Sequence, residues 1–111
     1  MVTEVLADET CVVAVAGDLD MYTAPRLEQE LSTALGNGTP QVVVDLSHCT
    51  FLDSTALGVL IAARKQLRRE AELSLVATDR NILKVFEITG LDRLFAIAST
   101  RTDALKHSNH D

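Results

Sequence analysis

Apolar positions along the chain follow two spacings: short continuous runs, and repeats every three or four residues. The continuous runs predict strands, because aliphatic runs bounded by polar turns are typical of buried strands; these runs are residues 2–6, 11–16, 41–46, 73–77 and 94–97. The helical repeats predict helices, one from Thr23 or Ala24 to a glycine-rich stop at residues 36–38, and others at residues 54–69, 80–89 and 100–107. The order is ββαβαβαβα in one domain of residues 1–111, with residues 108–111 expected to form a disordered tail.

This order predicts an α/β fold with a mostly parallel sheet. Strands that alternate with helices pair in parallel through right-handed crossovers. The first two strands are joined by a short polar turn at residues 8–10, which predicts an antiparallel hairpin at the N-terminal edge of the sheet.

Two polar segments stand out as places for chemistry, residues 17–22 and residues 47–55. Within them, residues 17–20 and residues 47–52 are expected to be loops. Functional groups of an open parallel sheet gather beyond the carboxyl ends of its strands, so we expect these two segments to lie side by side.

The second segment contains a helix start signal. With Asp53 as N-cap, Leu52 and Leu57 occupy the two positions of a hydrophobic staple. Ser54 then becomes the first residue of the helix and points to solvent. Two interpretations stay open at this point: Ser54 is a hydroxyl accessible to another protein's active site, or Asp53, Ser54 and Thr55 are only a redundant set of capping residues.

Composition narrows the class of partner. Hydrophobic residues make up 47% of the chain and aromatic residues 4%, so the core is expected to consist of Val, Leu, Ile and Ala. The net charge of −6 disfavours nucleic acid and anionic membranes as direct partners.

No apolar run approaches the roughly 18 residues of a spanning helix, and the first residues do not resemble a signal peptide, so a cytoplasmic protein is expected. The basic residues at 64–69 are interpreted as the solvated last turn of a helix.

Metal and disulfide chemistry have little support in the sequence. Cys11 begins an apolar strand and Cys49 is expected in a loop beside His48, without a C-x-x-C pair. The three histidines have no metal-ligand spacing. We therefore expect two reduced structural cysteines and no metal site.

A hydrolase is a weak alternative. Ser54 with His48 or Cys49 would need a base and an orienting group at hydrogen-bond distance, and the G-x-S-x-G nucleophile signature is absent. We expect that the protein is not an enzyme.

A phosphoacceptor receiver domain is a stronger alternative. Asp45 is the candidate acceptor at a strand end, and Asp18 and Asp20 could imitate its magnesium-binding pair. Such a domain also needs a lysine near the last strand, and no lysine lies between Lys84 and Lys106. This interpretation fails at that point.

Three segments resemble the STAS domain family, in particular its stand-alone anti-sigma factor antagonists. They cover nearly the whole chain in the expected order. The segments are Gly-Asp-Leu-Asp at residues 17–20 with Thr-Ala-Pro at 23–25, Val-Val-Val-Asp-Leu at 42–46 with Phe-Leu-Asp-Ser-Thr-Ala-Leu-Gly-Val-Leu at 51–60, and Thr-Gly-Leu-Asp-Arg-Leu-Phe at 89–95. The Asp-Ser core after a buried strand is the most specific of these features.

The resemblance implies a partner switch. An anti-sigma factor serine kinase would phosphorylate Ser54, with Thr55 as the alternative acceptor, and a serine phosphatase would reverse the reaction. The unphosphorylated form would bind the anti-sigma factor and free the sigma factor. The implied partner-binding residues are Asp18, Asp20, Asp53, Ser54, Thr55 and Gly58. No cofactor is implied, because the partner holds the nucleotide, and a monomer or weak dimer is expected. The alternative role is a STAS scaffold or interaction module of a stress-sensing complex.

Two further expectations concern single residues. Asp20 is implied to contact the kinase, so Asp20→Ala is expected to weaken binding with little loss of thermal stability. Family members commonly have Gly where this chain has Ala56, and the added methyl group is expected to narrow the approach of a kinase loop. A Gly-Gly or similar pair is common where this chain has Glu70 and Ala71.

Overall fold

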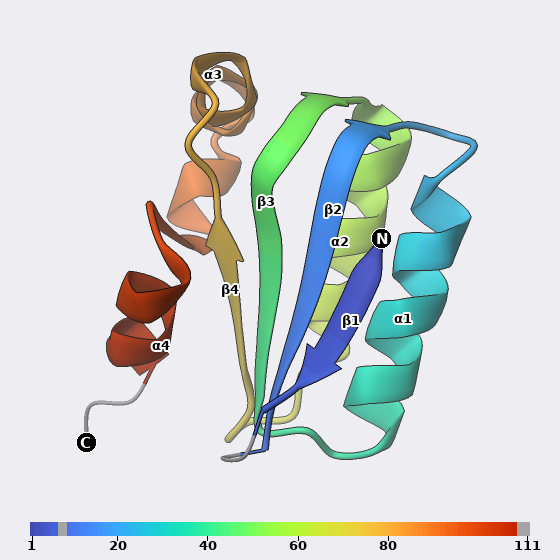
Figure 1. Ribbon diagram of the computed structural model, residues 1–111, viewed down its shortest axis with the longest axis vertical. Helices are drawn as coiled ribbons and strands as arrows, with labels where there is room; N and C mark the ends of the chain where they lie inside the picture. Colours follow the sequence, from blue (N-terminus) through green and yellow to red (C-terminus); the bar gives the residue numbers. More distant parts are fainter. Residues whose placement is uncertain (7–8, 109–111) are drawn as a thin grey trace.

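A five-stranded sheet with helices on both faces forms the structure (Figure 1). The computed structural model describes residues 1–6 and 9–108, with the backbone alone at residues 106–108. The strands are β1 (Val2–Val5), β2 (Thr10–Leu19), β3 (Gln41–Leu52), β4 (Glu72–Val76) and β5 (Ala96–Ala98). The helices are α1 (Ala24–Gly36), α2 (Ser54–Lys65), α3 (Arg80–Thr89), the 3-10 turn η1 (Leu91–Arg93) and α4 (Arg101–Ser108).

The strand order across the sheet is β1-β2-β3-β4-β5. β1 runs antiparallel to β2, and the other neighbours are parallel. Each helical crossover thus brings the next strand beside the previous one, as right-handed connections allow. The predicted ββαβαβαβα order and the mixed sheet with an antiparallel N-terminal hairpin are confirmed.

The two faces of the sheet pack against different helices. In Figure 1, α1 and α2 stand together against one face and α4 lies on the other. Successive residues of a strand point to opposite faces, so Val13 and Val44 belong to the main core under α1 and α2. Val12 and Val43 belong to a smaller cluster that is closed by Ala104 of α4. The core is aliphatic, as the composition predicts.

The two predicted loops at residues 17–20 and 47–52 are largely strand, which corrects the sequence-based assignment. β2 and β3 stay paired as far as Leu19 and Leu52. Two shifts of register, next to Ala14 and Gly17, let the pairing continue through polar residues. Gly17 has φ of +79°, a left-handed conformation that glycine adopts without strain. In β3, exposed residues lie here between buried ones such as Cys49 and Leu52, and this mixed pattern resembles a loop in sequence.

Helix α2 is shorter than predicted. It ends at Lys65, where Gln66 donates its N–H to the carbonyls of Ala62 and Ala63, and it does not continue to Arg69. The chain then turns through residues 68–71, so the basic segment is only partly a helix end. Strong helix formers fill this segment, and neither glycine nor proline signals the stop.

The last strand starts later than predicted, at Ala96 instead of Leu94. Residues 91–93 form η1, and Phe95 is buried edge-on against Phe86 with ring centroids 6.2 Å apart.

At the predicted turn of residues 8–10, Thr10 already belongs to β2 and residue 8 lies outside the described residues. Of the predicted tail, Ser108 ends α4 and residues 109–111 lie outside the described residues.

Candidate functional site

The ends of β2 and β3 bring the two predicted polar segments together. Leu19 pairs with Leu52, and the N–H of Asp53 donates to the carbonyl of Leu19 at 3.2 Å. The N–H of Met21 in turn donates to Asp53 Oδ2 at 3.1 Å. The expectation that the segments lie side by side is correct, and hydrogen bonds hold them in contact.

Asp53 is the N-cap of α2, as predicted. Its backbone is extended, with φ of −111° and ψ of −177°, and its Oδ1 accepts the N–H of Ala56 at 3.1 Å. Its second oxygen accepts the N–H of Met21. One carboxylate therefore caps a helix and joins the two loops, which is a structural role.

Ser54 is the first residue of α2 and is exposed. Its hydroxyl makes no hydrogen bond within the described part of the chain, because Asp53 does the capping. The N–H groups of Ser54 and Thr55 have no hydrogen-bond partner among the described residues either, as is normal for the first turn of a helix. Thr55 is also exposed. Asp53 is thus the capping residue, and Ser54 takes no part in capping.

The two acidic residues of the first segment differ in their surroundings. Asp20 Oδ1 accepts the N–H groups of Tyr22 and Thr23 at 2.9 and 3.2 Å. The N–H of Asp20 donates to Thr23 Oγ1 at 3.0 Å, which completes a tight turn before α1. Asp18 is exposed, and its carboxylate has no hydrogen bond in the part of the chain that is described. Asp20→Ala is therefore expected to lower stability by about 1 kcal/mol, through the loss of these turn hydrogen bonds.

Ala56 does not obstruct the approach to Ser54. Its side chain is completely buried in the main core, so the methyl group points away from any partner. The expectation that it narrows the approach of a kinase loop is wrong for this reason. Gly58, one turn after Ser54 on the same face of α2, is exposed, and a Cβ at this position would meet nothing within 4 Å.

Three exposed apolar side chains surround this site, and sequence reasoning missed them. Met21 is 60% exposed, Tyr22 83% and Phe51 50%. Phe51 pairs with Asp18 across β2 and β3, and Met21 is the residue bonded to Asp53. Large apolar side chains in water are typical of protein-binding surfaces. The Met-Tyr pair directly before a helix start is the signal that could have indicated them.

The residues weighed as a hydrolase pair do not contact Ser54. Cys49 is a buried residue of β3, not of a loop, and its thiol donates to the carbonyl of Phe51. His48 Nδ1 lies 3.3 Å from Ser47 Oγ. Both cysteines are free and buried, and burial raises the pKa of each thiol, which fits unreactive structural residues.

The residue weighed as a receiver-type acceptor has another partner. Asp45 lies inside β3 and is buried, and its Oδ2 accepts Arg101 Nε at 2.6 Å. Arg101 NH1 also bonds Glu4 Oε1 at 2.9 Å. Burial alone would raise the pKa of Asp45, but hydrogen bonds from Ser47 and Arg101 outweigh it and hold the pKa below its usual range. The group is a structural carboxylate.

The described residues contain neither a metal-ligand cluster nor a membrane-spanning helix. No three His, Cys, Asp or Glu side chains among them gather as metal ligands do. No helix of residues 1–6 and 9–108 has the length and apolar character to span a bilayer.

Comparison with known proteins gives consistent matches. The family model described as "Mlab, STAS domain" matches residues 2–97. The chain is 36% identical over 91 residues to an anti-sigma-B factor antagonist of Staphylococcus aureus, which covers 81% of this chain and 84% of that protein. It is 37% identical over 86 residues to the anti-sigma-B factor antagonist of Listeria monocytogenes, covering 77% and 75% of the two chains.

A solved structure is similar over almost the entire chain. The crystal structure of an anti-sigma factor antagonist from Mycobacterium paratuberculosis superimposes with a TM-score of 0.92 at 35% sequence identity. The match covers 98% of this chain and 92% of that one. The sequence and the fold are thus both similar to proteins described as anti-sigma factor antagonists.

Proposed function

Because the chain belongs to the STAS domain family and, within it, to the anti-sigma factor antagonists, we propose that it is a phosphorylation-controlled partner switch. The unphosphorylated form binds an anti-sigma factor kinase through the surface around Ser54, and phosphorylation of Ser54 ends this binding. The observation that supports the proposal is the exposed Ser54 hydroxyl, which Asp53 leaves without a structural task. Members of this group are regulatory proteins, not enzymes.

The phosphorylation step needs only the partner's ATP. The oxygen of the Ser54 hydroxyl attacks the γ-phosphorus of ATP, the bond to the β-phosphate oxygen breaks, and ADP and a proton leave. The product carries about −1.5 to −2 charges at pH 7. The N–H groups of Ser54 and Thr55 have no hydrogen-bond partner among the described residues, so they can donate to a phosphate at the start of α2. A negative group at a helix N-terminus stabilises the folded protein by about 0.3–1 kcal/mol. The fold of the protein therefore survives modification.

The same phosphate opposes docking. The proposed binding surface consists of Ser54, Thr55 and Gly58 with Asp18, Met21 and Phe51, and it is part apolar and part acidic. A partner that covers this surface would have to desolvate the phosphate beside Asp18. A loss of roughly 2–3 kcal/mol at such an interface weakens binding about 30- to 150-fold.

Other members of the circuit follow from the same switch. A serine phosphatase would restore the free hydroxyl, and the cytoplasm is the expected compartment, since sigma factors and their kinases act there. Asp20 and Asp53 would support the surface by holding the two loops together, while Asp18 and Gly58 would face the partner.

The decisive experiment mixes the purified chain with its cognate anti-sigma factor kinase and ATP. Mass spectrometry should find one phosphate on Ser54, none in Ser54→Ala, and phosphate still on Ser54 in Thr55→Ala, which removes the alternative acceptor. In binding assays Ser54→Ala should bind the kinase constitutively and Ser54→Asp weakly. Phosphate on Thr55 alone, or equal affinity of the two Ser54 variants, would contradict the proposal.

A further inference from the structure

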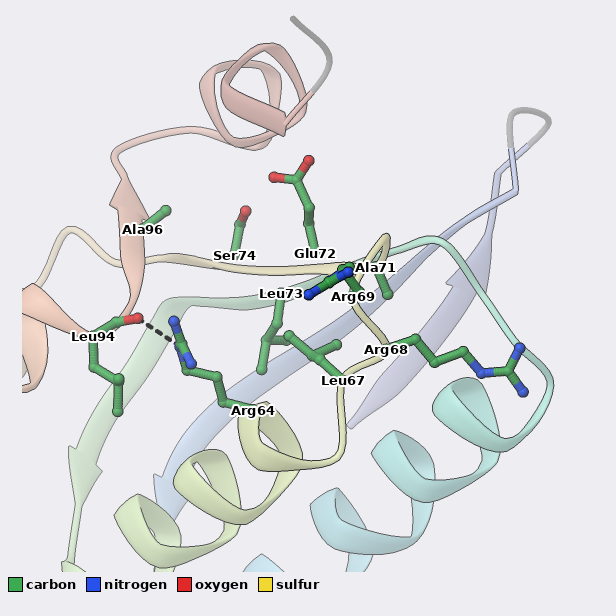
Figure 2. Close-up of a pocket in the computed structure, with 10 residues that line it drawn as sticks. All are labelled: Arg64, Leu67, Arg68, Arg69, Ala71, Glu72, Leu73, Ser74, Leu94 and Ala96. Carbon is green, nitrogen blue, oxygen red and sulfur yellow. Dashed lines mark hydrogen bonds between the residues drawn. The ribbon is translucent and has the colours of Figure 1, made fainter. Parts of the chain in front are cut away.

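A cavity at the far end of α2 from Ser54 has a basic lining. Its volume is about 410 Å³, within the range of small-ligand pockets. The cavity lies between the end of α2, the first residues of β4 and the segment before β5 (Figure 2). Its lining residues include Arg64, Arg68 and Arg69 and a single acid, Glu72. This is an unusual concentration of positive charge in a chain whose net charge is −6.

The arginine side chains are not equivalent. Arg64 is held in place, because its Nε donates to the carbonyl of Leu94 at 2.7 Å, and this bond leaves its two terminal nitrogens available. Arg69 also lines the cavity, while Figure 2 shows Arg68 extending away toward α1. Arg68 lies beside Gly38, at 3.6 Å from the position of an added Cβ. Arg64 and Arg69 therefore frame the cavity.

The wall also offers a backbone donor. β5 pairs with β4 only from Ser74 onward, so Glu72 and Leu73 form an open edge. The N–H of Glu72 donates to Pro40 on the β3 side, and alternation along a strand directs the N–H of Leu73 the other way. The carbonyl that it would meet there, that of Leu94, accepts from Arg64 instead.

The acid in the lining does not oppose this arrangement. Figure 2 shows the side chain of Glu72 on the opposite side of β4 from Leu67 and Leu73, directed away from Arg64. The carboxyl end of α2 attracts cations, and the arginine of its last turn meets that preference. Two guanidinium groups and one edge N–H thus line a cavity whose single acid, Glu72, has its side chain on the other side of β4.

We propose that this cavity binds the phosphate group of a small phosphorylated ligand, through Arg64, Arg69 and the N–H of Leu73. Planar guanidinium groups donate paired hydrogen bonds to phosphate oxygens, which a lysine cannot do. The apolar side chains of Leu67 and Leu94 would line the remainder of the ligand. The site is separate from the surface around Ser54, so its ligand would not compete directly for the hydroxyl.

The test is a titration of the full chain with inorganic phosphate and, separately, with glycerol phosphate, at constant ionic strength set with chloride. Amide resonances in ¹H–¹⁵N spectra report the site. The signal of Leu73 should shift for both probes, and tighter binding of glycerol phosphate would identify a phosphate monoester, whereas equal binding would identify free phosphate. No saturable shift of Leu73 with either probe would overturn the proposal.

Matched variants separate a built site from general attraction. Arg64→Ala and Arg69→Ala should each weaken phosphate binding about 10-fold or more, the usual size for a charged hydrogen bond. Lys65→Ala removes the same charge next to Arg64 but outside the lining, and it should leave binding within about twofold. Arg64→Lys keeps the positive charge but lacks the paired donors, so its affinity for phosphate should stay as low as that of Arg64→Ala. If Lys65→Ala and Arg69→Ala lost phosphate affinity equally, the binding would depend on net charge alone and the proposed site would be wrong.

Discussion

Residues 53–58 divide their tasks according to burial. Asp53 is half-buried and holds backbone N–H groups, Ala56 is buried in the core, and Ser54 is exposed without a hydrogen bond in the described chain. Gly58 is exposed and makes no close contact at its missing side chain. Consecutive positions of one helix start thus serve either the fold or the surface, and rarely both.

Gly58 offers a test of this division. Gly58→Ala should stabilise the protein by about 1 kcal/mol, because alanine is a better helix former and its methyl group meets nothing. The same methyl group stands one turn after Ser54, where it should weaken kinase binding by at least several-fold. Thermal unfolding and a binding titration measure the two effects.

The control is Gly36→Ala, at the last residue of α1, where an added Cβ also meets nothing. It should leave kinase binding unchanged. If Gly58→Ala binds as tightly as the original chain, the proposed binding surface does not include this part of α2.

At the same scale, the sequence was informative about Ser54 because capping is a local rule. An Asp before a helix, with leucines at the staple positions, predicts which residue caps and which is free. Phe51 lies in β3 after the register shifts against β2, which are long-range and leave no local pattern, so its exposure could not be predicted from the sequence. The sequence also does not indicate the structural role of Asp20, because an aspartate that stabilises a turn and one that binds a partner occur in similar local sequences.

Helices α2 and α3 start in the same way, which makes them a natural comparison. Asp53 caps α2, and Asp79 caps α3 by accepting the N–H groups of Asn81 and Ile82. Only Asp53 also accepts a hydrogen bond from another loop, from Met21. Loss of the cap should therefore have local consequences in α3 and wider ones at the site.

We expect Asp53→Ala to lower the free energy of unfolding by about 1–2 kcal/mol and to weaken kinase binding, because both loops lose their common bond. Asp79→Ala should cost about 1 kcal/mol with unchanged binding. Denaturant unfolding and titration with the kinase distinguish the two. Equal effects of both variants on binding would mean that the Asp53–Met21 bond is irrelevant to the site.

The existence and order of the elements could be predicted because apolar spacing is a strong signal, but several ends could not. β2 and β3 continue where their apolar runs stop, since the two strands stay paired through residues of mixed polarity. α2 stops where propensity favours continuation, and the chain turns into β4 after residues 68–71. Tertiary contacts decide these ends, and the arginine-lined cavity is one result.

On the scale of the whole molecule, Arg101 connects the last helix to the first and third strands. It bonds both Asp45 and Glu4, on the face of the sheet that α4 covers. Apart from Ala104 and its neighbours, α4 presents few apolar residues to the sheet. The ion pair is thus one of the contacts that hold α4 against the sheet, beside the packing of Ala104 and Leu105.

The pair predicts a pH dependence of stability. The pKa of Asp45 is lower in the folded protein than its unfolded value of about 3.9, so its contribution is fully present above that value. It is lost as the pH falls through the folded pKa. Asp45→Asn should remove roughly 1–2 kcal/mol at neutral pH, since Arg101 stays partly open to solvent, and should flatten the loss of stability below about pH 4.

Glu4→Gln is the control, because Glu4 is an exposed partner of the same arginine. It should cost less than about 1 kcal/mol. Unfolding curves recorded between pH 3 and 7 compare the variants. A curve for Asp45→Asn as steep as that of the original chain would assign the acid sensitivity to other carboxylates.

The pairing of Leu19 with Leu52 has a further consequence for encounter with a partner. Two separate surface loops would have to lose conformational freedom when covered, and that entropy would count against affinity. Here both segments continue directly from the paired strands β2 and β3, so most of this conformational entropy is already lost when the protein folds. Under the proposed function, association at this surface can then be fast, and phosphorylation of Ser54 alone can reverse it.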